Sequence, residues 1–141
     1  MLVDKTVVEK KLNHLKHGIE KLKAMDFTME RVLEDEDIQD MIDRRMQVAI
    51  ENCIDIATHL AAAMELPRRE YASDIFLLLG KNEIISKKLA EKFIGVVGLR
   101  NILVHEYADI DYKLAYSNLA DKLEDLKQFA REVLGFLERK N

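Results

Sequence analysis

The fold class follows from one stretch near the C-terminus, residues 112–140, which reads YKLAYSNLADKLEDLKQFAREVLGFLERK. Its apolar side chains recur at alternating steps of four and three residues, which is the spacing of one face of an α-helix. This apolar stripe consists of Tyr112, Tyr116, Leu119, Leu123, Leu126, Ala130, Val133 and Leu137. Asp111 is the expected N-cap, and Arg139 and Lys140 suit the negative end of the helix dipole. The stretch therefore predicts one long amphipathic helix.

Further segments upstream repeat this spacing. They predict long helices over residues 5–25, 38–65 and 83–104, with shorter helices over 28–34 and 71–80. Thr6 and Glu9 have the spacing of a capping box in the first helix. The acidic run at 34–37 suits the positive end of the second long helix, and so predicts where that helix begins. Gly80 is the expected C-cap of the helix at 71–80.

The composition supports an all-α class. The chain has 141 residues, of which five are glycine and one is proline, too few to supply the turns of a many-stranded β fold. Its apolar content of 48% is that of a folded protein rather than a disordered one. Four long helices with short connections predict an antiparallel, up-and-down bundle of four to five helices. The length fits a single domain that spans residues 1–141.

Charge and residue usage exclude several classes of function. The net charge is −4, so no overall positive field attracts nucleic acid, and any RNA site has to be local. The N-terminus does not resemble a signal peptide and no apolar run is long enough to span a membrane, so we expect a cytoplasmic protein. Cys53 lies on an apolar stripe and is interpreted as a core residue. His14 and His17 lack a third ligand nearby, so we interpret them as solvated and expect no metal site.

Two features suggest contacts with another helix or another molecule. The second long helix carries apolar residues on more than one stripe, namely Met41, Ile42, Met46, Val48, Ala49, Ile50, Cys53 and Ile54. A single core face requires fewer, so we predict a homodimer that buries on the order of 1,000 Å² or more. Gly95 and Gly98, late in the helix at 83–104, are expected to permit the close approach of another helix.

The polar residues of the chain that packing explains least well lie at 100–107, in the order Arg-Asn-Ile-Leu-Val-His-Glu-Tyr. Asn101 and His105 are four residues apart and share a helical face. Arg100 is one position off that face, and its long side chain is expected to let the guanidinium converge with the imidazole. Histidine exchanges protons near neutral pH, and the planar arginine fork matches phosphate oxygens. Such a pair suits cleavage of a phosphodiester without a metal. A packing cluster at a helix end is an alternative that these residues alone leave open.

The spacing R-x4-H-x-Y within GLRNILVHEY, residues 98–107, resembles the signature of the HEPN superfamily and of its HepT-like toxin branch. The following Glu106, the segment 55–59 of the second long helix and the closing helix are also similar to that family. The resemblance covers essentially the whole chain. It implies a HEPN-like helical bundle that acts as the toxin of a toxin–antitoxin system. The implied activity is that of a metal-independent endoribonuclease that needs no cofactor.

The resemblance also assigns roles to residues. It implies that Arg100 binds the scissile phosphate, His105 is the acid–base group and Asn101 orients the cleft. Tyr107 would receive AMP from an MntA-like nucleotidyltransferase antitoxin, and a homodimer would place two Arg/His pairs along one cleft for RNA. The alternative is a non-catalytic helical subunit that helps a minimal nucleotidyltransferase bind its nucleotide or substrate. A purely structural bundle would leave the polar residues at 100–107 without a role.

Overall fold

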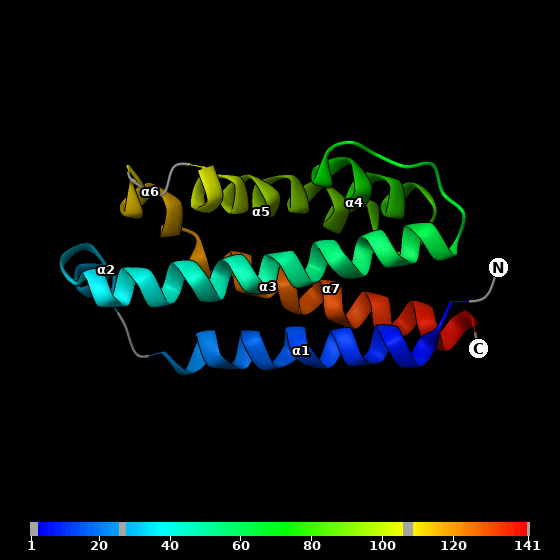
Figure 1. The fold of residues 1–141 in the computed structure, drawn as a ribbon, viewed down its shortest axis with the longest axis horizontal. Coiled ribbons are helices and arrows are strands. Elements are labelled where there is room, and N and C mark those ends of the chain that lie inside the picture. The colour runs from blue at the N-terminus through cyan, green and yellow to red at the C-terminus, as the bar shows by residue number, and fades with distance from the viewer. Residues whose placement is uncertain (1–2, 26–27, 106–108, 141) are drawn as a thin grey trace.

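The computed structural model describes residues 3–25, 28–105 and 109–140, and all regular secondary structure in these ranges is helical. The helices are α1 (Lys5–Ala24), α2 (Met29–Glu34), α3 (Glu36–Ala63), α4 (Ala72–Lys81), α5 (Lys87–His105), α6 (Tyr112–Tyr116) and α7 (Leu119–Lys140). The long helices α1, α3, α5 and α7 run alternately in opposite directions (Figure 1). This arrangement confirms the predicted all-α, up-and-down bundle. None of the described helices is both long and apolar enough to cross a membrane.

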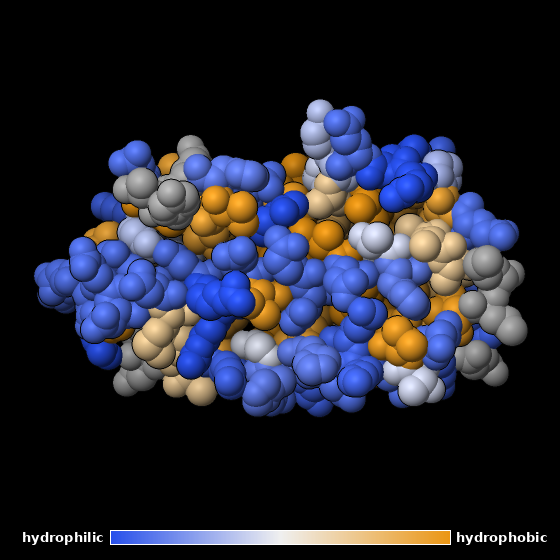
Figure 2. Space-filling model, in the orientation of Figure 1, coloured by the Kyte–Doolittle hydropathy of each residue, from blue (hydrophilic) through white to orange (hydrophobic). Residues whose placement is uncertain are grey.

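Helix α3 is the centre of the bundle and packs against α1, α4, α5 and α7. Because it has neighbours on several sides, most of its apolar residues are used inside the chain. Those buried in the core are Ile42, Met46, Ala49, Ile50 and Cys53, whereas Met41 and Val48 are exposed. The exposed face of α3 is largely hydrophilic, with separate apolar patches (Figure 2). The apolar surplus on this helix, from which we predicted a dimer, is therefore mostly taken up by the fold itself.

Side-chain caps set where the first and third helices begin. The Asp4 carboxylate accepts a hydrogen bond from the backbone N–H of Val7 at 3.2 Å, so Asp4 is the N-cap of α1. The predicted capping box at Thr6 is therefore wrong by two residues. Asp35 caps α3, and the next two residues are acidic and lie in its first turn. This confirms that the acidic run marks the beginning of this helix.

The junction between α4 and α5 differs from the prediction. Gly80 lies inside α4 and is buried, so it is not the C-cap. A Cβ atom at this position would lie 2.8 Å from the Cβ of Ala90, which means that the glycine allows α5 to pack closely on α4. The chain instead turns at Glu83, which adopts a φ of 61°. This left-handed conformation is incompatible with a continuing helix, so α5 begins at Lys87 rather than at residue 83.

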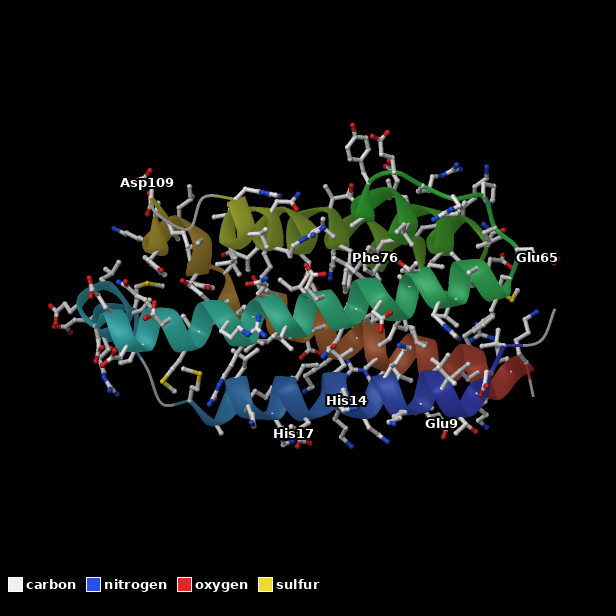
Figure 3. The ribbon with its side chains drawn as sticks, viewed as in Figure 1. Glu9, His14, His17, Glu65, Phe76 and Asp109 are labelled. Carbon is white, nitrogen blue, oxygen red and sulfur yellow. The ribbon has the colours of Figure 1, made fainter. Side chains whose placement is uncertain are left out.

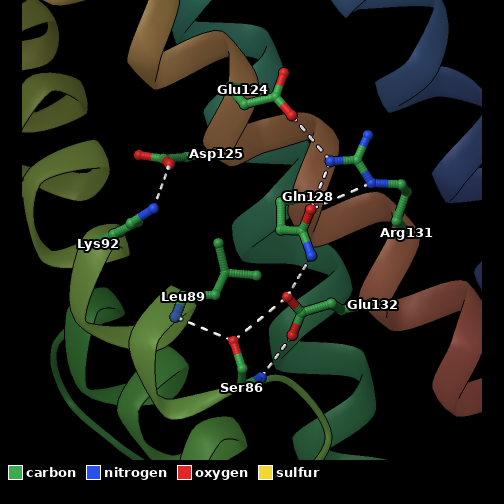
Figure 4. A network of polar contacts seen from close by, with 8 residues as sticks. All are labelled: Ser86, Leu89, Lys92, Glu124, Asp125, Gln128, Arg131 and Glu132. Atoms are coloured by element: carbon green, nitrogen blue, oxygen red, sulfur yellow. Dashed lines mark hydrogen bonds and ion pairs between the residues drawn. The ribbon is translucent and has the colours of Figure 1, made fainter.

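The beginning of α5 is fixed by α7. The Glu132 carboxylate accepts a hydrogen bond from the backbone N–H of Ser86 at 2.6 Å, and Gln128 donates another to the same carboxylate at 2.8 Å (Figure 4). The Ser86 hydroxyl accepts a hydrogen bond from the N–H of Leu89 at 3.2 Å. These contacts satisfy N–H groups that have no partner within the helix. Helix α5 is thus anchored at the end opposite to the 100–107 segment.

The predicted C-terminal helix is interrupted. It consists of α6 and α7, which are separated by Ser117 and Asn118. The Ser117 hydroxyl donates a hydrogen bond to the carbonyl of Leu114 at 3.2 Å, a local bond that competes with the helical pattern. Asp111 caps α6 by accepting from the N–H of Leu114 at 3.1 Å, as predicted. The break gives α6 an orientation of its own, beside the end of α5 (Figure 1).

Candidate active site

The motif residues from Arg100 to His105 form the end of α5. Asn101 and His105 are both exposed, and their spacing of four residues places them on one face of the helix. This agrees with the face that the sequence predicts for the pair. The imidazole and the amide therefore both face solvent, where a substrate can reach them.

Arg100 lies on a different side of α5. Five positions along an α-helix correspond to a rotation of about 140°, so Arg100 and His105 cannot both point in the same direction. The Arg100 side chain extends toward α3, where its Nη1 donates a hydrogen bond to Oε1 of Glu51 at 3.2 Å. Within the described residues, no hydrogen bond joins Arg100 to His105. The expected convergence of these two groups within one chain is therefore not found.

The Arg100–Glu51 ion pair is only partly shielded from water. The side chain of Arg100 is 21% exposed and that of Glu51 is 44% exposed. The Nε of Arg100 is buried and has no hydrogen-bond partner in the described part of the chain. One edge of the guanidinium is thus held by Glu51, and the exposed part can still accept a second anion. Glu51 lies 49 residues away in sequence, and a single carboxylate within a helix gives no local signal, so the sequence analysis did not identify it.

Tyr107, the expected modified residue, lies outside the described residues, and so do its neighbours Glu106 and Ala108. The flanking segments are described, namely His105 at the end of α5 and Asp109 near the beginning of α6.

Helix α6 is fastened to α3 by a cluster of two tyrosines and one carboxylate. The hydroxyl of Tyr112 donates to Oδ2 of Asp43 at 2.5 Å, and that of Tyr116 donates to Oδ1 at 2.6 Å. Burial raises the pKa of the Asp43 carboxyl, and the two hydrogen bonds oppose this effect. Burial and the bond to Asp43 raise the pKa of both phenols. Both phenols therefore stay protonated at neutral pH and can donate these bonds, which hold α6 against α3.

Other candidate sites offer less chemistry. His14 and His17 are exposed on α1, at the edge of the bundle opposite to Asp109 (Figure 3). Across residues 3–25, 28–105 and 109–140, no group of three or more His, Cys, Asp or Glu side chains is placed to hold a metal ion. Cys53 is buried, and burial raises the pKa of its thiol well above the ordinary value. A buried thiol of this kind is unreactive, which agrees with its interpretation as a core residue.

The chain is similar to known nucleases over most of its length. A family profile described as Ribonuclease HepT-like matches residues 15–133. The mRNA nuclease HepT of Shewanella oneidensis is 29% identical over 123 residues, which cover 87% of this chain and 92% of the relative. The tRNA nuclease HepT of Aphanizomenon flos-aquae is 25% identical over 136 residues, which cover 96% of this chain and 92% of the relative.

A solved structure of the same kind is similar over most of the chain. It is the tri-AMPylated HEPN toxin of Shewanella oneidensis in complex with MNT antitoxin, with a TM-score of 0.83 and 28% identity. The match covers 92% of this chain and 97% of that toxin. A toxin with this fold thus carries AMP groups and binds an antitoxin.

Proposed function

Because this chain belongs to the family of HepT-like ribonucleases, we propose that it is a toxin that cleaves RNA with Arg100 and His105 and is silenced by AMP on Tyr107. The observation that carries this proposal is the position of the motif on the last turns of α5. His105 and Asn101 face solvent there, and Arg100 presents a partly exposed guanidinium. We also propose that the protein acts in the cytoplasm, where its RNA substrates are found.

The proposed reaction is a transesterification within the RNA. The ribose 2′-oxygen attacks phosphorus, the bond from phosphorus to the 5′-oxygen breaks, and a 2′,3′-cyclic phosphate and a 5′-hydroxyl are formed. One proton has to leave the 2′-hydroxyl and one has to reach the leaving oxygen, and an imidazole can serve either step near neutral pH. The guanidinium of Arg100 stabilises the charge that develops on the phosphate. Asn101 donates or accepts a hydrogen bond that orients the substrate.

We propose that the working unit is a homodimer. Because Arg100 and His105 diverge by about 140° on α5, one chain does not direct both groups at a single phosphate. Two copies that face each other across a shared cleft can combine the arginine of one with the histidine of the other. The apolar side chains of Met41 and Val48, which are exposed on α3, are available to such an interface.

Control by AMP rests on the distance along the chain between His105 and Tyr107, which is two residues. An adenylyl group on the phenol adds a negatively charged phosphate close to the catalytic histidine. That group repels the RNA backbone and competes for the arginine. We propose that an MNT-type nucleotidyltransferase antitoxin transfers this AMP from ATP.

The decisive experiment incubates the purified chain with single-stranded RNA, with and without EDTA, next to His105→Ala. We expect cleavage that survives EDTA, is lost in the variant and leaves 2′,3′-cyclic phosphate ends. Cleavage that requires a metal, or that persists in His105→Ala, would contradict the mechanism. Absence of cleavage together with tight binding to the nucleotidyltransferase would favour the alternative, a non-catalytic helical partner subunit.

A further inference from the structure

Tyr71, the N-cap residue of α4, carries the only exposed aromatic ring among residues 3–25, 28–105 and 109–140. The side chain is 64% exposed and makes no capping hydrogen bond. N-cap positions favour Ser, Thr, Asp and Asn, whose side chains bond to helix N–H groups, so this ring contributes nothing to the start of α4. The backbone of Tyr71 is used, because its carbonyl accepts a hydrogen bond from the N–H of Asp74 at 3.1 Å. The fold thus fixes the position of a ring that it does not bury.

The packing of α4 on α5 brings this ring to the level of the motif. A Cβ atom at Gly80 would lie 2.8 Å from that of Ala90, which fixes one point of the antiparallel pairing between the two helices. Nine residues before Gly80 is Tyr71, and nine residues after Ala90 is Leu99. Both helices rise by about 1.5 Å per residue, so Tyr71 lies near the level of the residue that precedes Arg100. Helix α4 accordingly covers only the first part of α5 (Figure 1).

Arg100 leaves α5 on the side that α4 covers. The Phe93 ring stacks on the Phe76 ring of α4, with centroids 4.4 Å apart, so Phe93 marks that side. Arg100 follows Phe93 by seven residues, which is about 20° short of two full turns, so the two side chains point in nearly the same direction. The stripe of α5 that faces α4 therefore continues into Arg100 where α4 no longer covers it. Tyr71 lies at the end of α4 that borders this uncovered part.

The surroundings of Tyr71 are charged but balanced. Arg68 and Arg69 are exposed in the loop that leads to α4, and within the described part of the chain neither makes a hydrogen bond or an ion pair. Glu70 and Asp74 are close to them along the chain, so this surface has no net positive charge. The aromatic ring, rather than the charge, is therefore what a ligand would find here.

We propose that Tyr71 stacks on a base of the RNA strand whose phosphate Arg100 binds, and this rests on the function proposed above. Proteins that bind single-stranded RNA lay unstacked bases on aromatic side chains, and any base can stack in this way. The fixed backbone of Tyr71 lowers the entropy that the ring loses on binding. The free guanidinium groups of Arg68 and Arg69 can contact a phosphate next to the stacked base. The ring would thus hold the strand beside the phosphate to be cleaved.

The test measures the Kd for a short single-stranded RNA by fluorescence anisotropy, in a His105→Ala background that prevents cleavage. Tyr71→Ala removes the ring, Tyr71→Leu keeps an apolar side chain without an aromatic face, and Tyr71→Phe keeps the face. Leu77→Ala is the matched control, since Leu77 is also an exposed apolar side chain of α4 but lies further from Arg100. We expect the Kd to rise by about ten-fold in Tyr71→Ala and Tyr71→Leu, and to be unchanged in Tyr71→Phe and Leu77→Ala. With His105 intact, the KM for cleavage should rise by the same factor in Tyr71→Ala, at an unchanged kcat.

A series of the same RNA, in which one nucleotide at a time lacks its base, locates the stacked position. At one position the missing base should weaken binding to the protein that retains Tyr71 by about ten-fold and leave binding to Tyr71→Ala unchanged. Equal binding of intact RNA with and without the ring overturns the stacking site. Tyr71→Leu that binds as well as Tyr71→Phe also overturns it, because an apolar contact would then suffice. Loss of the dimer in Tyr71→Ala does the same, because the ring would then serve a second copy. If the wild type neither binds nor cleaves RNA, the proposed function fails, and the stacking site fails with it.

Discussion

Arg100 donates a hydrogen bond to Glu51 at 3.2 Å, so the arginine of the motif is paired with a carboxylate of its own chain. Both side chains reach solvent, and an exposed pair of this kind stabilises a fold by about 0–1 kcal/mol. Its main effects are therefore on the site. The carboxylate orients the guanidinium and at the same time competes with the substrate phosphate for its charge.

The first prediction concerns this competition. Glu51→Gln keeps a hydrogen-bond acceptor next to Arg100 but removes the negative charge. We expect the KM for RNA to fall by about two- to five-fold, because the phosphate no longer competes with a carboxylate. Glu51→Ala also removes the acceptor and should lower kcat, because the guanidinium loses its orientation. Steady-state kinetics with a short RNA separates the two effects, and a KM that rises in Glu51→Gln would contradict this competition.

The second prediction concerns the shared cleft. Arg100→Ala and His105→Ala should each reduce RNA cleavage by at least about 100-fold. When the two inactive proteins are unfolded together and refolded, mixed dimers should recover a substantial part of the activity. Each mixed dimer contains one intact arginine and one intact histidine, on different chains. The wild type and each variant are refolded alone as controls.

Mixed dimers that stay inactive would mean that one chain supplies both groups to each phosphate. Light scattering of the wild type at micromolar concentration provides an independent check. A monomer in solution would exclude the shared cleft.

The third prediction concerns Tyr116 and Asp43. Tyr116→Phe removes the donor from one oxygen of a half-buried carboxylate and should lower the free energy of unfolding by about 1–3 kcal/mol. Tyr112→Phe should cost less, because Tyr112 is more exposed than Tyr116 and water can replace its hydroxyl. Urea unfolding of the two variants and the wild type measures the difference. Equal effects would contradict the view that burial makes the Tyr116 bond the stronger anchor of α6.

The fourth prediction is the pH dependence that Asp43 confers. In the folded state, burial raises the pKa of the Asp43 carboxyl above its ordinary value of 3.8. The folded protein therefore binds the carboxyl proton more tightly than the unfolded chain does. The free energy of unfolding that the bound proton contributes is therefore fully present below pH 3.8. It is lost as the pH rises through the raised pKa of the folded state. Relative to Asp43→Asn, the wild type should gain stability as the pH falls from neutral toward 3.8. A difference that is constant with pH, or that has the opposite sign, would contradict the assigned role of burial.

Much of the fold was predictable from the sequence, because apolar spacing and caps are local signals. The four long helices, the short helix at 28–34 and the cap at Asp111 follow from them. The errors arose where tertiary contacts override local preference. Gly80 has the residue type of a C-cap but serves a close contact with Ala90, and the last helix breaks where α6 turns toward Asp43.

The candidate site was predictable only in part, for a similar reason. The motif residues are close in sequence, so their spacing showed that Asn101 and His105 share a face. Glu51 and Asp43 come from α3, far from the motif in sequence, and a carboxylate in the middle of a helix has no local signature. Five helical positions turn Arg100 about 140° away from His105, so the expected convergence within one chain is not found, and Glu51 then fixes where the guanidinium points.

The last prediction concerns control of the toxin through Tyr107. Tyr107→Phe has no phenol to accept AMP but keeps Arg100 and His105, so it should cleave RNA as the wild type does. After treatment with the nucleotidyltransferase and ATP, wild-type cleavage should fall by at least about 100-fold, because the added phosphate is anionic and stands where the RNA backbone approaches. Tyr107→Phe should stay active. Tyr71→Phe is the matched control, since Tyr71 is an exposed tyrosine at the start of α4 and should be dispensable for silencing. If treatment silences Tyr107→Phe as fully as the wild type, the antitoxin acts by binding alone, and AMP transfer to this residue is not what closes the site.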